Sequence, residues 1–282
     1  MDEPAVIAHR GFAGVAPENT VAAAKFAAEC EATALEIDVQ PAACGTPVVV
    51  HDARLDGRRD GRALTDAAGL VWETPLEDVR AADVLDSGET VPTLAALFAA
   101  VPETMAINVE LKNPGTKDLR VGESLPEDER SRRRDLWEPF VERVVDDCDD
   151  FGGEILFSSF CEGALAALRD VSPEYATAAL VWDSLEDGIA IARRYDCEAI
   201  HPPRNAIAGT ATVDERYGGY PASEPSVDVL EVAHEEGRTV NVWTVETWVQ
   251  FDELRRVGVD GIIADYPGLG KSADRGENRS HR

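Results

Sequence analysis

The chain has 282 residues and a formal net charge of −27 at pH 7. A surface this acidic repels nucleic acid and anionic membranes, so we expect no nucleic-acid partner and no polyanionic substrate without a bound cation. An apolar content of 44% is enough for a full core, and the length fits one large α/β barrel or two modest domains.

The first residues run directly into an apolar stretch, without the cationic and apolar regions of a signal peptide. No apolar run approaches the roughly 20 residues that a membrane-spanning helix needs. The five cysteines are scattered and form no C-x-x-C pair, as is typical of reduced thiols. We therefore expect a cytoplasmic protein without stable membrane insertion, and its oligomeric state stays open.

Eight apolar, β-rich runs alternate with helical stretches along the chain. They cover residues 5–9, 34–39, 106–112, 155–160, 177–182, 198–202, 239–245 and 260–265. Strands that alternate with helices favour a parallel sheet, and eight of them predict a (β/α)8 TIM barrel, whose catalytic groups lie at the carboxyl ends of the strands. We expect one barrel domain over residues 1–270.

A ninth run at 48–51 follows the second run after only a short turn at Gly45. This gap is too short for a parallel crossover, so residues 34–51 are predicted to form a hairpin. Residues 53–90 then interrupt the alternation and are predicted to form a small insertion. The polar residues 271–282 lack apolar anchors and are predicted to be disordered.

Titratable side chains stand at the ends of the first predicted strands. The first apolar run ends in His9 and Arg10, and the short ninth run ends in His51. On a strand, Glu36 and Asp38 have the same parity, so both project from one face. They form a paired carboxylate site that suits a hard cation.

A third acidic side chain, Glu110, lies on the next predicted strand, and Lys112 follows it on the same side. Three carboxylates on two neighbouring strands suit Mg²⁺ or Ca²⁺, with Mn²⁺ as a further candidate, because water and substrate can complete the ligand shell. Zinc is disfavoured because it usually takes histidine or cysteine ligands.

Four short motifs follow one another in one register: His9-Arg10-Gly11, Pro17-Glu18-Asn19-Thr20, Glu36-Ile37-Asp38-Val39 and His51-Asp52. With the later segments 108–112, 157–160, 242–245 and 261–267, they span most of the chain. In this order and spacing, the sequence resembles the glycerophosphodiester phosphodiesterase family, relatives of the phosphatidylinositol-specific phospholipases C. Four motifs in register are far more specific than any one alone.

The resemblance implies an enzyme that hydrolyses glycerophosphodiesters to glycerol phosphate and an alcohol. It also implies that His9 and His51 act as general acid and general base, and that a divalent metal ion binds Glu36, Asp38 and Glu110. Hydrolysis of a phosphodiester requires charge neutralisation, a base and an acid, and this set of residues supplies all three.

Other positions are expected to contact the substrate. The guanidinium of Arg10 and the ammonium of Lys112 suit a phosphate. Trp243 and Phe160 are predicted to shape the substrate pocket, although an aromatic residue at a barrel rim is nearly as often a packing residue. In the family that the chain resembles, a small insertion such as 53–90 lies beside the active site.

The sequence departs from the family's pattern after Asp52. The usual Arg-Thr-Thr-like element is replaced there by Asp56–Arg59. The predicted acid, base and metal ligands are unaffected, so this departure puts the head-group preference in doubt and not the activity.

Two alternatives stay open: a catalytically silent barrel that binds phosphodiesters, and a phosphodiesterase that acts on a related lysophospholipid. A barrel aldolase or isomerase for sugar phosphates is a weaker hypothesis, because Lys112 is the only lysine at a predicted strand end and stands beside a carboxylate. The sequence leaves open the leaving alcohol, the stereochemistry of the glycerol phosphate, the physiological cation, and the choice between a cyclic intermediate and direct attack by water.

The scarcity of lysine gives a prediction about salt. The chain has only four lysines beside 54 acidic residues. This composition resembles that of proteins from salt-accumulating microbes, where a Debye length of about 3 Å at 1 M salt screens self-repulsion. We therefore expect a halophilic protein whose circular dichroism signal decays when KCl is diluted from molar to millimolar concentration. A steady signal would indicate an ordinary acidic protein.

Overall fold

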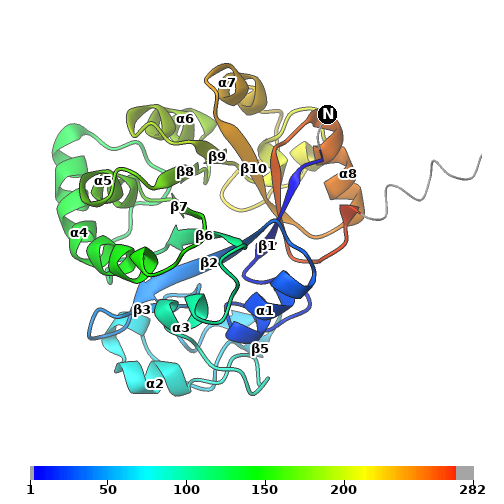
Figure 1. Cartoon of the computed structure of the whole chain (residues 1–282). Coiled ribbons are helices and arrows are strands. Elements are labelled where there is room, and N and C mark those ends of the chain that lie inside the picture. Colours follow the sequence, from blue (N-terminus) through cyan, green and yellow to red (C-terminus); the bar gives the residue numbers. More distant parts are fainter. Residues whose placement is uncertain (1–2, 271–282) are drawn as a thin grey trace, which may run out of the picture.

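The computed structural model describes residues 3–270, and the predicted polar tail at 271–282 lies outside them. Eight parallel strands close into a barrel, because the first strand pairs with both the second and the last. Their bounds are β1 Ala5–His9, β2 Ala34–Pro41, β6 Ala106–Leu111, β7 Ile155–Ser159, β8 Ala176–Leu180, β9 Ala199–His201, β10 Thr239–Val245 and β11 Gly261–Ala264. Each predicted apolar run forms one strand, and the (β/α)8 TIM barrel is confirmed (Figure 1).

Helices surround the barrel on its outer side (Figure 1). Those within residues 3–270 are α1 Val21–Glu29, α2 Leu76–Ala81, α3 Leu94–Phe98, α4 Glu127–Asp149, α5 Glu162–Val171, α6 Leu185–Arg194, α7 Val229–Glu235 and α8 Trp248–Val257, with 3₁₀ turns at Val71–Glu73, Arg204–Ala206 and Ala211–Asp214. Polar side chains cap several helix starts. The hydroxyl of Thr20, for example, accepts a hydrogen bond from the amide of Ala23 at the start of α1.

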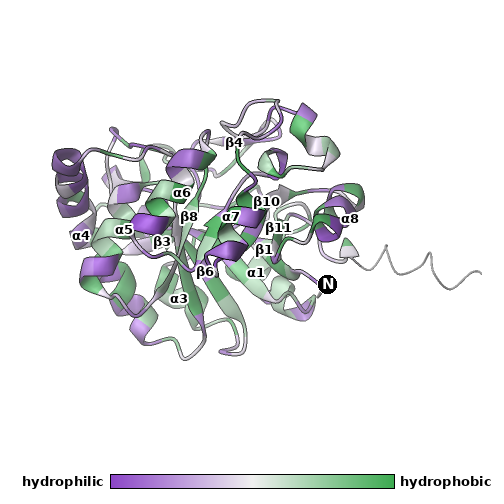
Figure 2. Cartoon of the chain, turned by 90° about the horizontal axis from the view of Figure 1, so that it is seen from above, coloured by the Kyte–Doolittle hydropathy of each residue, from purple (hydrophilic) through white to green (hydrophobic). Residues whose placement is uncertain are grey.

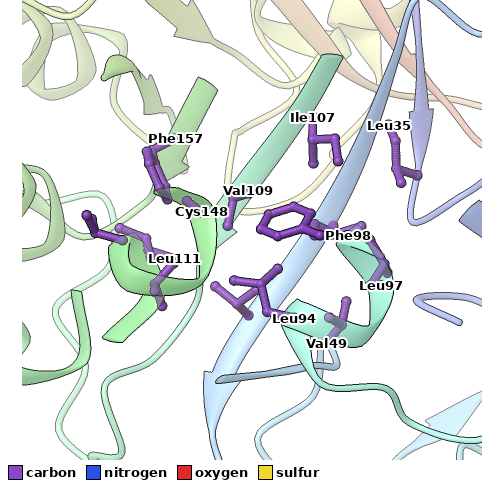
Figure 3. Packing of buried hydrophobic residues seen from close by; sticks show 14 of the residues in the cluster. Leu35, Val49, Leu94, Leu97, Phe98, Ile107, Val109, Leu111, Cys148 and Phe157 are labelled. Carbon is purple, nitrogen blue, oxygen red and sulfur yellow. The ribbon is translucent and has the colours of Figure 1, made fainter. Parts of the chain in front are cut away.

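Alternation along the strands separates the core from the barrel interior. Leu35 of β2 and Ile107 of β6 belong to a buried cluster that includes Leu94 of α3 (Figure 3). The intervening residues Glu36 and Glu110 line a cavity inside the barrel mouth instead. The two-residue period of a strand thus places apolar residues against the helices and carboxylates toward the cavity.

Strand register brings the predicted site residues level with one another. His9 of β1 lies opposite Glu36 of β2, and Asp38 of β2 lies opposite Glu110 of β6. Neighbouring strands lie about 4.8 Å apart, so side chains that share one face at the same level come into direct reach. Residues far apart in the sequence therefore converge at one end of the barrel.

The predicted hairpin is present, with β3 (Pro47–Val49) pairing antiparallel to the end of β2. The side-chain amide of Gln40 on β2 donates hydrogen bonds to the backbone carbonyls of Val50, His51 and Asp52 at 3.0, 2.9 and 3.0 Å. One buried side chain thereby ties the segment that carries His51 to the strand that carries the acidic pair.

The segment 53–90 holds a two-stranded hairpin, β4 (Arg58–Arg59) and β5 (Arg62–Ala63), as well as α2. It has its own apolar cluster, in which Leu55 and Val79 pack with Val48 from the barrel side. Apolar packing therefore anchors the insertion on the return strand β3.

Hydropathy follows the same division between inside and outside. Apolar residues concentrate on the barrel strands, whereas α4 is predominantly hydrophilic where it faces outward (Figure 2). Between residues 3 and 270, no helix combines the length and the apolar character needed to cross a membrane.

Candidate active site

A cavity of about 750 Å³ opens at the carboxyl ends of the strands. One part of its wall is charged and is formed by His9, Arg10, Glu18, Glu36, His51, Arg59, Glu110 and Lys112. Another part is aromatic and is formed by Phe160, Trp182, Tyr217 and Trp243. Of the residues predicted for the site, only Asp38 is not part of this lining. It is buried, with its carboxylate beside those of Glu36 and Glu110.

Glu36, Asp38 and Glu110 form a compact acidic cluster. Each offers a carboxylate oxygen, and these oxygens lie within 4.8 Å of one another. Asp38 Oδ1 is buried and has no hydrogen-bond partner among the described residues, although Lys112 Nζ lies 3.6 Å from it. Because buried polar atoms are normally paired and the donor set is all oxygen, the cluster fits a hard divalent cation.

Burial and mutual repulsion shift the pKa values of this cluster. Burial raises the pKa of Glu36 well above its ordinary value, and the charges of Asp38 and Glu110 raise it further. Burial also raises the pKa of Glu110, to about 7, although the ammonium of Lys112 opposes the shift. Burial would raise the pKa of Asp38 too, but the charges of Arg10, His51 and Lys112 together outweigh it and hold that pKa below its usual range. Positive charge placed among the three acids therefore stabilises their ionised forms.

Two basic side chains touch the acidic cluster. Arg10 donates its backbone N–H to Glu36 Oε2 at 2.9 Å, and its Nε lies 3.1 Å from Asp38 Oδ2. Lys112 Nζ lies 2.8 Å from Glu110 Oε1. Burial would lower the pKa of either base, but the surrounding carboxylates raise both values, so both groups stay charged. The cavity wall thus presents two positively charged side chains, Arg10 and Lys112, beside the carboxylates.

Each cavity histidine pairs with a carboxylate through Nδ1. His9 Nδ1 lies 2.6 Å from Asp265 Oδ1, and His51 Nδ1 lies 2.7 Å from Asp52 Oδ1. Because an ionised carboxylate only accepts hydrogen bonds, Nδ1–H is the donor, and Nε2 is the atom that can exchange a proton. Burial lowers the pKa of His51 to about 4, and the charges of Arg10 and Lys112 add to this effect.

The loop after β1 supplies two residues that support the site. Asn19 donates from Nδ2 to Asp38 Oδ2 at 2.8 Å and accepts the backbone N–H of Asp38 at 3.2 Å. Glu18 accepts a hydrogen bond from Arg10 Nη1 at 2.9 Å. Asn19 therefore orients Asp38, and Glu18 orients Arg10.

The aromatic wall contains both of the predicted pocket residues, Trp243 and Phe160, whose rings meet edge to face with centroids 5.4 Å apart. Trp182 packs beside them, its ring nearly parallel to that of Trp243 at 6.4 Å. Tyr217 lies 5.7 Å from Trp243 on another side. The indole Nε1–H of Trp243 donates to the backbone carbonyl of His201 at 2.8 Å, which fixes the ring. Trp182 and Tyr217 were not predicted as site residues: Trp182 ends the predicted run 177–182, and Tyr217 lies in the long segment between β9 and α7.

Comparison with known proteins identifies the family of the chain. A model of the Glycerophosphoryl diester phosphodiesterase family matches residues 9–269. The chain belongs to this family. Membership confirms the family that the four motifs indicated and the expected class of enzyme, a glycerophosphodiester phosphodiesterase.

Relatives and solved structures agree along nearly the whole chain. A glycerophosphodiester phosphodiesterase of Bacillus altitudinis is 26% identical over 277 residues, which cover 93% of this chain and 94% of the relative. A glycerophosphodiester phosphodiesterase of Caldanaerobacter subterraneus is 26% identical over 271 residues, with 93% and 94% coverage. The structure of an Oleispira antarctica phosphodiesterase in complex with the product sn-glycerol-3-phosphate superposes with a TM-score of 0.74 at 26% identity, covering 97% of each chain.

Proposed function

We propose that this glycerophosphoryl diester phosphodiesterase hydrolyses glycerophosphodiesters to glycerol phosphate and an alcohol with the help of a divalent cation. The observation that carries the proposal is the convergence of the acidic cluster and two histidine–carboxylate pairs on one cavity. The Oleispira antarctica phosphodiesterase, which binds sn-glycerol-3-phosphate, supports the assignment of the glycerol phosphate product.

The cation would be held by Glu36, Asp38 and Glu110. Their oxygen-only donor set favours Mg²⁺ or Ca²⁺, with Mn²⁺ as a third candidate. When bound, such a cation supplies charge neutralisation for a phosphodiester and lowers the pKa of a nearby hydroxyl. Asp38 is the central ligand in this arrangement, because Arg10 and Asn19 fix one of its oxygens and the other lacks a hydrogen bond.

The phosphate would be bound by Arg10 and Lys112. The two bases lie on either side of the acidic cluster, and both stay charged in spite of their burial. The guanidinium of Arg10 contacts Glu18 through Nη1 and Asp38 through Nε, so it would offer a phosphate its remaining N–H groups, whereas the ammonium of Lys112 acts as a point charge. Together they would orient the diester by its negative charge.

Protons would move through the Nε2 atoms of His9 and His51. One imidazole takes the proton of the attacking hydroxyl, and the other gives a proton to the departing alkoxide. Asp265 and Asp52 hold the two rings in the required tautomer and stabilise each ring while it is charged. The nucleophile is either the adjacent glycerol hydroxyl or water. Detection of a cyclic phosphate by ³¹P NMR would establish the first route.

Trp243 and Phe160 would form the wall against the leaving alcohol. They adjoin the charged wall, because Lys112 Nζ lies 5.5 Å from the ring centroid of Phe160. An alcohol bound beside a phosphate on Lys112 would therefore meet these rings. This position gives the aromatic wall a role in head-group choice while the charged wall performs the chemistry.

The direct test is an assay in high salt of glycerophosphodiester hydrolysis by the purified protein. We expect turnover of glycerophosphocholine, glycerophosphoethanolamine or glycerophosphoglycerol with Mg²⁺ or Ca²⁺, and its loss when a chelator removes the cation. Activity should return when excess Mg²⁺, Ca²⁺ or Mn²⁺ is added, and the order of recovery identifies the preferred ion. Glycerol phosphate release is measured with a coupled dehydrogenase. Full turnover in chelator would contradict the role of the acidic cluster, and absence of turnover with every diester would favour a silent binding barrel.

A further inference from the structure

Arg59 reaches the cavity from the insertion and not from a barrel strand. It ends β4, just before the turn formed by Asp60 and Gly61, which both have positive φ angles of 50° and 81°. This Asp-Gly pair fits a two-residue hairpin turn, which fixes the direction of the strand before it. Arg59 and Asp60 are the residues of the segment 53–90 that line the cavity.

The guanidinium of Arg59 forms a two-pronged bond with Glu18. Its Nε donates to Glu18 Oε2 at 2.6 Å, and its Nη2 donates to Glu18 Oε1 at 2.8 Å. The side chain of Glu18 is only 3% exposed. Its burial would raise the pKa, but Arg10 and Arg59 outweigh this and lower it. Glu18 is therefore a buried, ionised carboxylate that depends on two arginines.

This bond connects the insertion to the phosphate-binding side of the site. Glu18 Oε1 accepts from Arg10 Nη1 as well as from Arg59. Arg10 in turn contacts Asp38 of the acidic cluster. A chain of alternating charges thus runs from the hairpin to the proposed cation ligand, and each member limits the rotamers of the next.

A second contact connects Arg59 to the proton-transfer side. Its Nη2 lies 3.7 Å from Asp52 Oδ1, the same oxygen that pairs with His51 Nδ1. Burial would raise the pKa of Asp52, but the hydrogen bond and charge of His51, with the charge of Arg59 in addition, lower it. One guanidinium therefore lies next to the carboxylates that orient both Arg10 and His51.

We infer that Arg59 is a positioning residue that sets the orientation of Arg10 through Glu18 and of His51 through Asp52. The inference rests on the proposed roles of Arg10 and His51. Arg59 ends the element Asp56–Arg59, so its contact with Glu18 joins the hairpin to the loop after β1. Its guanidinium need not touch the substrate to affect the reaction.

The test compares Arg59→Ala and Glu18→Gln, singly and together, in the Mg²⁺-dependent assay. We expect either change to lower kcat by about 10- to 100-fold, since misplacing catalytic groups by about 1 Å has effects of this size. The double variant should lose less than the product of the two single fold-losses, because both changes break the same Arg59–Glu18 bond. Added guanidinium below denaturing concentrations should partly restore kcat of R59A, which a loss of stability alone would not allow.

Two further variants keep the test decisive. Arg54→Ala is the matched control, because Arg54 lies in the same insertion and forms an exposed two-pronged pair with Asp56, away from the cavity. We expect its kcat to be unchanged. Arg59→Lys keeps the charge but cannot form the two-pronged bond, so it should remain impaired, and it replaces R59A if that protein does not fold.

Three outcomes would each overturn the inference. They are an unchanged kcat in folded R59A, fold-losses that simply multiply in the double variant, and full activity of R59K. A failure of the proposed function is seen differently. It would appear in the unaltered protein as absence of cation-dependent turnover, whereas a failure of this inference appears only in the variants.

Discussion

Alanine at His9 or at His51 should lower kcat by at least about 100-fold, because each change removes one of the two proton-transfer groups. Both rings line the cavity, and each is held through Nδ1 by a carboxylate that survives the substitution. The effect should fall mainly on kcat and leave KM nearly unchanged, because Arg10 and Lys112 still bind the phosphate. Steady-state kinetics with glycerophosphocholine and Mg²⁺ measures both parameters.

The sequence offers a matched histidine control. His234 lies on α7, is exposed, and pairs through Nε2 with Asp260 at 2.9 Å, outside the cavity. H234A should therefore keep its kcat. Near-normal turnover in both H9A and H51A would contradict the acid and base assignment while leaving the fold and the family unaffected.

Asparagine at Asp38 should abolish both cation binding and turnover. The substitution preserves the shape of the side chain but removes the charge of the cluster's central carboxylate. Changes to groups that merely support metal ligands typically weaken binding 10- to 100-fold, so loss of a ligand should weaken it by more than about 100-fold. Isothermal titration with Mg²⁺ or Mn²⁺ measures affinity directly, without relying on activity.

A control for this substitution should also remove a buried carboxylate. Glu162 on α5 is fully buried, pairs with Arg194, and accepts the backbone N–H of Leu125 at 2.6 Å. Glu162→Gln should lower the thermal stability but leave the cation affinity unchanged. An equal loss of affinity in E162Q and D38N would show that the effect of D38N comes from general destabilisation, and wild-type affinity in D38N would exclude Asp38 as a ligand.

Much of the barrel could be predicted because strand periodicity is a local property. In Leu35-Glu36-Ile37-Asp38 the apolar and acidic residues alternate, so the sequence alone places the two carboxylates on one face. The closure of β1 on β11 then follows from eight strand and helix alternations. Local pattern and barrel topology together bring the predicted catalytic, ligand and phosphate-contacting residues to one cavity.

Contacts that depend on loop conformation could not be predicted in the same way. Arg59 meets Glu18 across 41 residues of sequence, and the meeting depends on how the hairpin folds over the barrel mouth. Trp182 lies just past the end of β8 and Tyr217 lies in the irregular segment between β9 and α7, where no periodic pattern marks the direction of a side chain. Asn19 belongs to one of the four motifs, but nothing in the neighbouring sequence predicts that its side chain bonds to Asp38.

The amide of Gln40 has a consequence for how this enzyme can diversify. Because that one amide bonds to three successive carbonyls of the return segment, it holds the proposed acid–base ring of His51 to the strand that carries two of the proposed cation ligands. Lengthening the tight bend at Gly45 would misalign the two, so that bend is a poor site for evolutionary insertions. The hydrogen bonds of Gln40 end at Asp52. We therefore expect that sequence changes after Asp52 can alter which alcohols are accepted and still leave the proposed reaction centre in place.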